Sequence, residues 1–322
     1  MRDFLTRAGW GEAEAAPLAG DASTRRYTRL HREDDSAILM EDPGGDVALF
    51  ARLADYLRGA GLSAPEILAM DPGRGLMLLE DFGDALFARR AECHPDEEPG
   101  LYQVAADVLL TLHRTAPADG LATATPAYLA SLTGLAFDWY LPRAGGTPDA
   151  SAEAAARDAF AEALEAHAPE AGVTVLRDYH AENLVWLPDR DGPRRAGLLD
   201  FQDAWIGHPA YDLVSLLQDA RRDVGDAAAA ACLRHYLDGS GLEAQRLETA
   251  CAVLGAQRNL RILGVFARLA VTRANPRYID LVPRVWHHLQ SDLAHPALAK
   301  LRGILDVLPA PTPSVLERLR TP

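Results

Sequence analysis

Two short stretches of the chain carry side chains suited to phosphoryl transfer. Asp178 and Asn183 are five residues apart, and Asp200 ends a later apolar run. In phosphoryl transfer one carboxylate receives the proton of an attacking hydroxyl, while an amide oxygen and a second carboxylate hold magnesium against the phosphates. Any one of the three residues alone is more often a turn or helix cap, but the three together favour a catalytic site.

A predicted β-hairpin would bring two of these side chains together. Two apolar segments, 184–187 and 196–199, are joined by a stretch rich in Pro, Asp and Gly, which is typical of a hairpin. Its strands start after Asn183 and end before Asp200, so both side chains are expected at the same end of the ribbon. Asp178 lies on the loop just before the hairpin, and we expect the three residues to converge.

The remaining elements divide the chain into a β-rich first part and a helical second part. Alternating and apolar runs between residues 14 and 42 predict about three antiparallel strands. An amphipathic helix over 47–60 and a strand pair over 63–68 and 76–80 follow. Beyond Asp81 the pattern is mainly helical. The expected helices include 2–10, 101–113, 128–141, 150–168, 243–274, 276–292 and 296–308, and a short strand is expected at 173–176.

Composition limits the partners and the compartment. The chain has 322 residues and a formal net charge of −14, which argues against nucleic acid or an anionic membrane as a partner. Three scattered cysteines and the absence of an 18-residue apolar run or a signal-peptide pattern predict a cytoplasmic protein. Lys300 is the only lysine, so phosphate contacts in the N-terminal half must come from Arg, backbone N–H groups or hydroxyls. The sequence leaves the oligomeric state open.

The motif around Asp178 resembles that of a known enzyme superfamily. Asp178-Tyr179-His180-Ala181-Glu182-Asn183, followed by Asp200-Phe201 and Tyr211-Asp212-Leu213, is similar to the catalytic loop and magnesium segment of protein-kinase-like enzymes. More narrowly, the motif resembles that of the aminoglycoside phosphotransferase and choline kinase family. This resemblance implies an α+β, two-lobed protein-kinase-like fold, with a small antiparallel β N-lobe containing one helix and a larger, mainly helical C-lobe.

The resemblance also implies a role for each matching segment. The nucleotide-binding lobe would cover residues 1–83 and end in a hinge at 80–83; the helical lobe would cover 84–322, with a catalytic loop at 176–184 and a magnesium segment at 199–203. Asp178 would be the catalytic base, Asn183 and Asp200 would bind Mg²⁺, and Arg177 and Asp212 would support the loop. The residues expected at ATP are Gly20, Ser23, Thr24, Arg25, Glu80 and Phe82.

One departure from the superfamily pattern concerns the phosphate grip. The lysine of the third strand is missing, and Met40 stands about where it belongs. The helix over 47–60 also lacks the glutamate that would pair with a lysine. Either Arg25, Arg26 or Arg29 contacts the phosphates, since guanidinium suits phosphate, or the protein has lost activity. We favour an arginine because the three catalytic-type residues are all present.

Further motifs are similar to the bacterial anomeric kinases of N-acetylmuramate and N-acetylglucosamine used in peptidoglycan recycling. They are residues 20–27, 38–43, 138–142 and 176–184. This resemblance implies transfer of the γ-phosphate of ATP to the C1 hydroxyl of the amino sugar. The residues expected at the sugar are His180, Trp139, Tyr140, Arg143 and Arg258. Packing of Trp139 and Tyr140 in the core, and orientation of the loop by His180, are the competing interpretations.

Two alternative functions remain at this stage. A kinase of aminoglycosides or amino alcohols would need carboxylates on helices 128–143 and 258–280 to bind a cation, but those helices carry several arginines. A nucleotide-binding pseudokinase that regulates a partner is the alternative of another class. The arginines suit a neutral or anionic sugar.

Overall fold

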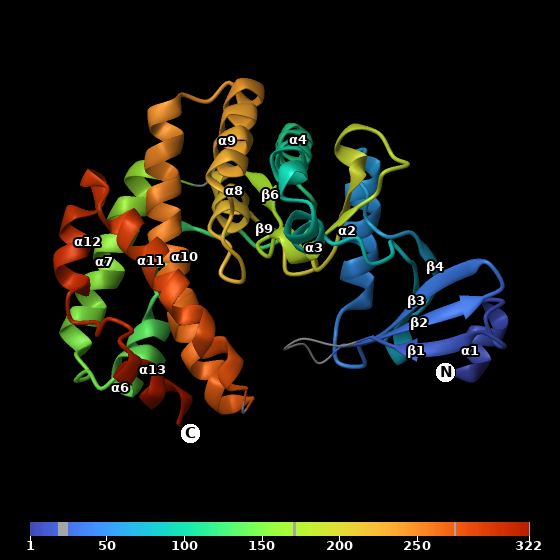
Figure 1. Ribbon diagram of the computed structural model, residues 1–322, viewed down its shortest axis with the longest axis horizontal. Helices are drawn as coiled ribbons and strands as arrows, with labels where there is room; N and C mark the ends of the chain where they lie inside the picture. The colour runs from blue at the N-terminus through green and yellow to red at the C-terminus, as the bar shows by residue number, and fades with distance from the viewer. Residues whose placement is uncertain (19–24, 170–171, 274, 322) are drawn as a thin grey trace. The chain divides into compact units, whose positions relative to one another are not determined.

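The structure is a computed structural model that describes residues 1–18, 25–169, 172–273 and 275–321. It consists of two compact units (Figure 1). The first contains residues 1–118 and 181–203, and the second contains residues 119–180 and 204–322.

The first unit is built on a five-stranded antiparallel sheet with strand order β1-β2-β3-β5-β4. Its strands are β1 (Glu14–Pro17), β2 (Arg26–Arg32), β3 (Asp35–Glu41), β4 (Ile67–Asp71) and β5 (Leu76–Glu80). The predicted meander and the predicted second strand pair are both present. The helices of this unit are α1 (Arg2–Arg7), α2 (Val47–Gly59), α3 (Phe87–Cys93) and α4 (Glu98–Arg114), with 3₁₀ turns at Pro72–Arg74, Pro95–Glu97, Ala181–Asn183 and Gly192–Arg195.

The two faces of the sheet make different contacts, because successive side chains along each strand point to opposite faces. On one face Leu30, Leu39 and Leu78 are buried in a cluster with Phe4 and Trp10 of the N-terminal segment. Figure 1 shows α1 beside this sheet. The other face therefore remains for a different layer of contacts, which is where the cavity described below begins.

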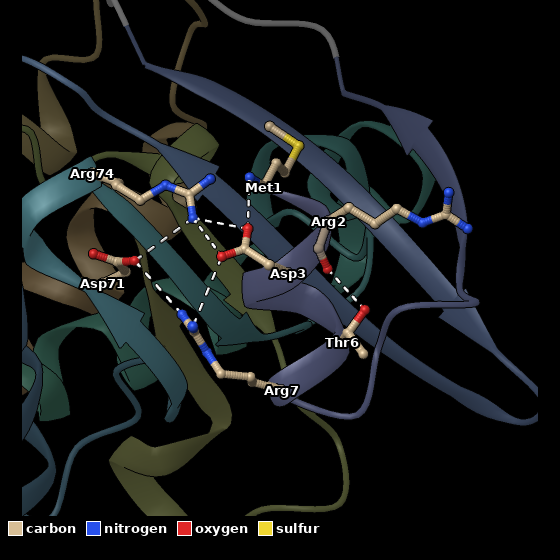
Figure 2. A network of polar contacts seen from close by, with 7 residues as sticks. All are labelled: Met1, Arg2, Asp3, Thr6, Arg7, Asp71 and Arg74. Atoms are coloured by element: carbon tan, nitrogen blue, oxygen red, sulfur yellow. Dashed lines mark hydrogen bonds and ion pairs between the residues drawn. The ribbon is translucent and has the colours of Figure 1, made fainter.

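Ion pairs attach α1 to the turn between β4 and β5. Figure 2 shows the network around Asp3, whose Oδ1 lies 2.9 Å from Nη1 of Arg74. Arg7 and Arg74 each also lie 3.9 Å from a carboxylate oxygen of Asp71. The hydrogen bond from Arg74 lowers the pKa of Asp3 to about 2. These groups are exposed, so the network orients the helix and adds little stability.

A β-hairpin far along the chain belongs to the first unit. β7 (Leu184–Trp186) pairs with β8 (Ala196–Leu198), as predicted. Leu198 N–H donates to Ser63 O at 2.7 Å, and Trp186 N–H donates to Ala85 O at 2.7 Å. The hairpin is thus hydrogen-bonded to segments just after α2 and just before α3. The compact units consequently group the chain differently from the predicted lobes, whose division at residue 83 remains a prediction.

The second unit is mainly helical, with one two-stranded sheet of β6 (Val173–Val175) and β9 (Trp205–Gly207). Its helices are α5 (Pro126–Ser131), a π-helix (Ala136–Tyr140), α6 (Leu141–Arg143), α7 (Ala150–His167), α8 (Ala210–Leu217), α9 (Asp226–Ser240), α10 (Ala244–Thr272), α11 (Val282–Leu293), α12 (Ala299–Leu305) and α13 (Pro313–Arg320), with 3₁₀ segments at Pro276–Leu281 and Pro296–Leu298. Among the described residues no helix meets the length and hydropathy needed to cross a membrane.

The helix predicted over 128–141 is interrupted. α5 ends at Ser131, and the chain resumes as a π-helix from Ala136. Its backbone there is pressed against α10, because a Cβ on Gly264 would lie 2.2 Å from the carbonyl carbon of Leu135. Thr133 also donates its hydroxyl to Ala130 O at 2.7 Å, which helps to end α5. The packing of Leu135 against α10, which lies far away in sequence, is not visible in the local periodicity of the segment.

The close approach at Gly264 predicts that this position tolerates no side chain. Gly264→Ala should lower the free energy of unfolding by about 1–3 kcal/mol, because backbone atoms must move to admit the methyl group. Gly303→Ala in α12 is the matched control, since nothing lies within 4 Å of a Cβ there, and it should raise stability by about 0.5–1 kcal/mol. Urea unfolding of both variants measures this. Equal stability of Gly264→Ala and the wild type would contradict the packing described here.

Candidate active site

A cavity of about 430 Å³ lies within the first unit, on the face of the sheet opposite α1. Arg29, Ile38 and Leu79 are in register across β2, β3 and β5 and line its wall. The other walls come from the hinge and from the β7–β8 hairpin, including Asn183 and Asp200. A volume of this size is typical of a small-molecule site.

The predicted hinge forms one edge of the cavity and is held by Arg190 of the hairpin loop. Arg190 pairs with the Glu80 carboxylate and donates to Ser63 Oγ at 2.7 Å. Its guanidinium carbon also lies 5.1 Å from the ring centroid of Phe82. Gly197 admits that ring, since a Cβ there would lie 2.7 Å from it. Glu80 and Phe82 are therefore fixed beside the cavity by residues more than a hundred positions later.

The structure separates the three arginines that the sequence left as candidates. Arg26 is exposed and lies 3.5 Å from Glu41. Arg29 is committed to the hinge segment, with an ion pair of 2.7 Å to Asp81 and one of 2.8 Å to Asp84. The hydrogen bond to Asp84 raises the pKa of Arg29 and lowers that of Asp84. Arg29 thus anchors the hinge.

Arg25 is the arginine that reaches the predicted metal segment. Its Nε donates to Asp42 Oδ2 at 2.8 Å, and its Nη1 lies 3.4 Å from Asp200 Oδ1. Asp42 follows β3 and is buried. Gly45 makes room for its carboxylate, because a Cβ there would lie 1.9 Å from Oδ2. A buried acid thus orients a cation on the wall of the cavity.

The two predicted magnesium ligands lie at the same end of the hairpin. Leu199 N–H donates to Asn183 O at 3.0 Å, so Asn183 and Asp200 sit on adjacent strand ends. Asp200 adopts a left-handed backbone conformation with φ of 55°. Phe201 behind it packs on Phe50 of α2, with ring centroids 4.8 Å apart. The packed aromatic ring helps to hold the Asp200 backbone in this conformation.

The available oxygen ligands suit Mg²⁺ better than they suit a metal ion whose ligands all come from the protein. Among the residues that the structure describes, no group of three or more His, Cys, Asp or Glu side chains forms a metal site. One carboxylate and one amide oxygen are a suitable partial shell, since Mg²⁺ takes its remaining ligands from water and substrate phosphates. Asp200 and Asn183 are the residues that would hold it.

Asp178 lies in the second unit, after a tight turn centred on Arg177. Arg177 has φ of 71°, and Asp178 N–H donates to Leu176 O at 2.9 Å. A left-handed conformation is costly for a residue other than glycine and persists only where neighbours enforce it. Here the buried Asp212 carboxylate accepts from Leu176 N–H at 2.6 Å and from Arg177 N–H at 2.8 Å.

Asp212 itself is entirely buried in α8. Burial raises the pKa of Asp212 to about 7, although its two backbone hydrogen bonds oppose the rise. Arg177 extends its guanidinium over the Trp205 ring, 4.3 Å from the centroid. The supporting roles of Arg177 and Asp212 remain predictions, and these contacts are the ones through which they would act.

His180 is buried in the second unit near two arginines. Its Nε2 lies 3.1 Å from Arg221 Nη1. Since a guanidinium only donates, Nε2 accepts, which places the imidazole proton on Nδ1. Burial, and then the charges of Arg221 and Arg258, lower the pKa of His180 well below its ordinary value. The ring is therefore neutral and is oriented by Arg221.

The other residues predicted at the sugar occupy different surroundings. Tyr140 is fully buried, donates its hydroxyl to Pro309 O at 2.6 Å and stacks on Trp286. Packing accounts for it. Arg143 bonds to backbone oxygens of Leu319 and Thr321 at the end of α13, and Trp139 is half-buried. Gly20, Ser23 and Thr24 lie outside the described residues.

The structure thus assembles the predicted residues in two groups. In the first unit Arg25, Glu80, Phe82, Asn183 and Asp200 line one cavity. In the second unit Arg177, Asp178, His180, Asp212 and Arg258 belong to one network of contacts and charges. The boundary between the units falls between His180 and Ala181. The convergence of all three catalytic residues therefore remains a prediction.

Four residues that hold the predicted site residues in place were not themselves predicted from the sequence. Asp42, Arg190, Ser215 and Arg221 act through long-range hydrogen bonds. For Asp42 the one local signal was the Pro43-Gly44-Gly45 segment that directly follows it, because a side chain on Gly45 would collide with the Asp42 carboxylate.

Comparison with known proteins decides the family. The model of the phosphotransferase enzyme family matches residues 14–248, most of the chain. The chain belongs to the phosphotransferase enzyme family. It is 41% identical to an N-acetylmuramate/N-acetylglucosamine kinase of Caulobacter vibrioides, over 94% of both chains. It is 33% identical to a kinase of the same name from Pseudomonas aeruginosa, over 96% of this chain and 94% of that one.

A solved structure shares the fold. A choline/ethanolamine kinase family protein from Mesorhizobium loti covers 99% of both chains, with a TM-score of 0.63 and 18% sequence identity. The predicted family and the predicted α+β, protein-kinase-like fold are confirmed. The protein is an enzyme of the kinase class, and family membership implies ATP as the phosphate donor and a small molecule as the acceptor.

The hydrogen bonds of Asp212 predict a large effect from a nearly isosteric change. Asp212→Asn should lower the free energy of unfolding by about 2–4 kcal/mol, because its amide nitrogen would face a buried N–H group instead of accepting from it. Asp306→Asn, at an exposed position after α12, is the control and should change stability by no more than about 0.5 kcal/mol. Denaturant unfolding compares the two. If both variants unfold like the wild type, Asp212 does not hold the turn.

Proposed function

We propose that the protein transfers the γ-phosphate of ATP to the C1 hydroxyl of N-acetylmuramate and N-acetylglucosamine. The observation that carries this proposal is the 41% identity, over 94% of both chains, to a relative named for these two sugars. The cavity, with its hinge, its arginine and its two oxygen ligands, supports the nucleotide half of the reaction. A cytoplasmic location suits ATP as donor.

In the proposed reaction Asp178 receives the proton of the acceptor hydroxyl as that oxygen attacks the γ-phosphorus. The bond between the γ-phosphorus and the oxygen that bridges it to the β-phosphate breaks, and ADP leaves. The anomeric hydroxyl of a sugar is more acidic than an ordinary alcohol, so a weak carboxylate base suffices. Asp200 and Asn183 would hold Mg²⁺, which would supply positive charge to the phosphates. The turn at Arg177 supports this assignment, because it fixes the backbone directly before Asp178.

Arg25 takes the place of the missing lysine in this proposal. It is the one of the three candidate arginines that pairs with both a buried acid and the metal segment. Asp42 then replaces the absent glutamate as the partner that orients the cation. A guanidinium can donate to Asp42 through Nε while its terminal nitrogens remain directed toward phosphate oxygens.

A panel of acceptors tests the proposed function. Incubation with ATP and Mg²⁺ should phosphorylate N-acetylmuramate and N-acetylglucosamine, and ³¹P NMR should place the phosphate on C1. Methyl glycosides of the same sugars, which lack a free C1 hydroxyl, should not react. Asp178→Ala should abolish turnover while nucleotide binding persists.

Other outcomes would point to other functions. Transfer to an aminoglycoside or an amino alcohol, and not to these sugars, would replace the acceptor. Nucleotide binding without transfer to any acceptor would indicate a pseudokinase.

Exchange of Arg25 should affect ATP more than any other substrate. Arg25→Met should lower kcat/KM for ATP on the order of 100-fold, because a preorganised charge at the phosphates is lost. Arg25→Lys should recover part of the loss, since it keeps the charge but not the fork. Arg26→Met, at the neighbouring exposed position, should stay within about twofold. A larger loss in Arg26→Met than in Arg25→Met would reverse the assignment.

A further inference from the structure

The carbonyl side of the Arg177 turn is held by a relay of two side chains that ends in a buried arginine. Ser215 of α8 donates its hydroxyl to Arg177 O at 2.9 Å. Arg258 of α10 donates from Nη2 to the same Ser215 oxygen, also at 2.9 Å. Asp212 binds the N–H side of the turn. The carbonyl oxygen of Arg177, directly before Asp178, therefore accepts a hydrogen bond from Ser215, while the N–H groups of Leu176 and Arg177 donate to Asp212.

Arg258 is an unusual choice for a purely structural contact. Its side chain is 6% exposed, and burying a guanidinium is expensive without a compensating charge. The buried residues around it on α10 include Gln257 and Asn259, whose polar groups serve helix packing. A neutral side chain of this kind would be a cheaper donor to a serine hydroxyl. The retained charge therefore requires a reason besides the hydrogen bond.

The charges around Arg258 supply that reason. Burial lowers the pKa of Arg258, and the nearby Tyr211, Asp178 and Asp219 counter this effect. Arg258 is thus close enough to the proposed base to interact with its charge. The relay gives the same arginine a second route to Asp178, through the backbone of the residue that precedes it.

Arg221 fixes the far side of the loop. The buried Asp219 accepts from Arg221 N–H at 2.8 Å, and Arg221 contacts His180 through its guanidinium. His180 follows Asp178 by two residues. Asp178 is consequently flanked on both sides by residues anchored to the segment from α8 to residue 221, so the backbone that carries its carboxylate is held on both sides.

We propose that Arg258 is a positioning residue, which holds Asp178 for proton transfer through Ser215 and the Arg177 carbonyl and does not contact the sugar. This inference rests on the proposed role of Asp178 as the base. It replaces the substrate contact that the sequence suggested for Arg258. The predicted signature is a loss in kcat with little change in the KM of either substrate, because small displacements of a reacting group cost rate and not ground-state binding.

Two single variants and their combination test the relay. Arg258→Met and Ser215→Ala should each lower kcat on the order of 10- to 100-fold, with both KM values within about twofold. The double variant should lose no more than the worse single variant, because both changes break the same path. Arg258→Lys should restore part of kcat. Gln257→Met, which removes the buried bond to Leu129 O, is the control for packing and should lower stability while leaving kcat within about threefold.

Three results would overturn the inference. A raised KM for the sugar with unchanged kcat would make Arg258 a substrate contact. Additive losses in the double variant would show that Arg258 does not act through Ser215. An equal fall of kcat in Gln257→Met would reduce both effects to general destabilisation. Should Arg258→Met fail to fold, Ser215→Ala and Arg258→Lys carry the same comparison.

Amide hydrogen exchange separates this inference from the proposed function. If the wild type phosphorylates neither sugar, the proposed function fails, but the relay still predicts faster exchange at the Leu176 and Arg177 amides in Ser215→Ala and Arg258→Met. Unchanged exchange at these amides, in protein that is otherwise folded, would refute the relay whatever the acceptor.

Discussion

The turn at Arg177 depends on the hydrogen bonds that the buried carboxylate of Asp212 accepts. The carboxylate accepts two backbone N–H groups in a place from which water is excluded. A buried carboxylate is costly unless its oxygens accept hydrogen bonds, and the two backbone N–H groups of the turn donate them. The helix that carries Asp212 also carries Ser215, so α8 binds both ends of the same peptide segment. Strain at Arg177 is thereby shared among several hydrogen bonds.

In the first unit positive charge must be placed at the cavity without a lysine. One face of its sheet is filled by α1 and its apolar partners, and the opposite face is left for a cavity. Arginines supply the positive charge around this cavity, and each pairs with a particular acid. Arg29 pairs with Asp84 and Arg190 with Glu80, and both hold the hinge, whereas Arg25 faces Asp200. A guanidinium has enough donors to bind its acid and still address a ligand.

Local sequence patterns predicted much of this architecture because the relevant signals are short-range. The strands of the first sheet, α2 and the β7–β8 hairpin follow from alternation, amphipathicity and turn residues, and all are present close to their predicted positions. The helix over 128–141 was predicted as continuous, and β9 was not predicted at all. In the first case the segment that follows the break packs closely against Gly264 of α10; in the second, three residues form a strand only because β6 pairs with them.

The sequence by itself determined the kind of chemistry, through the types and spacing of Asp178, Asn183 and Asp200, and through the presence of only one lysine. It also determined which segments alternate as strands and which are amphipathic enough to form packed helices. Tertiary structure decided which arginine faces Asp200 and which acid orients that arginine. Arg25, Arg26 and Arg29 are nearly equivalent along the chain. They differ because each meets a different carboxylate, and those carboxylates lie between 15 and 175 residues away in sequence.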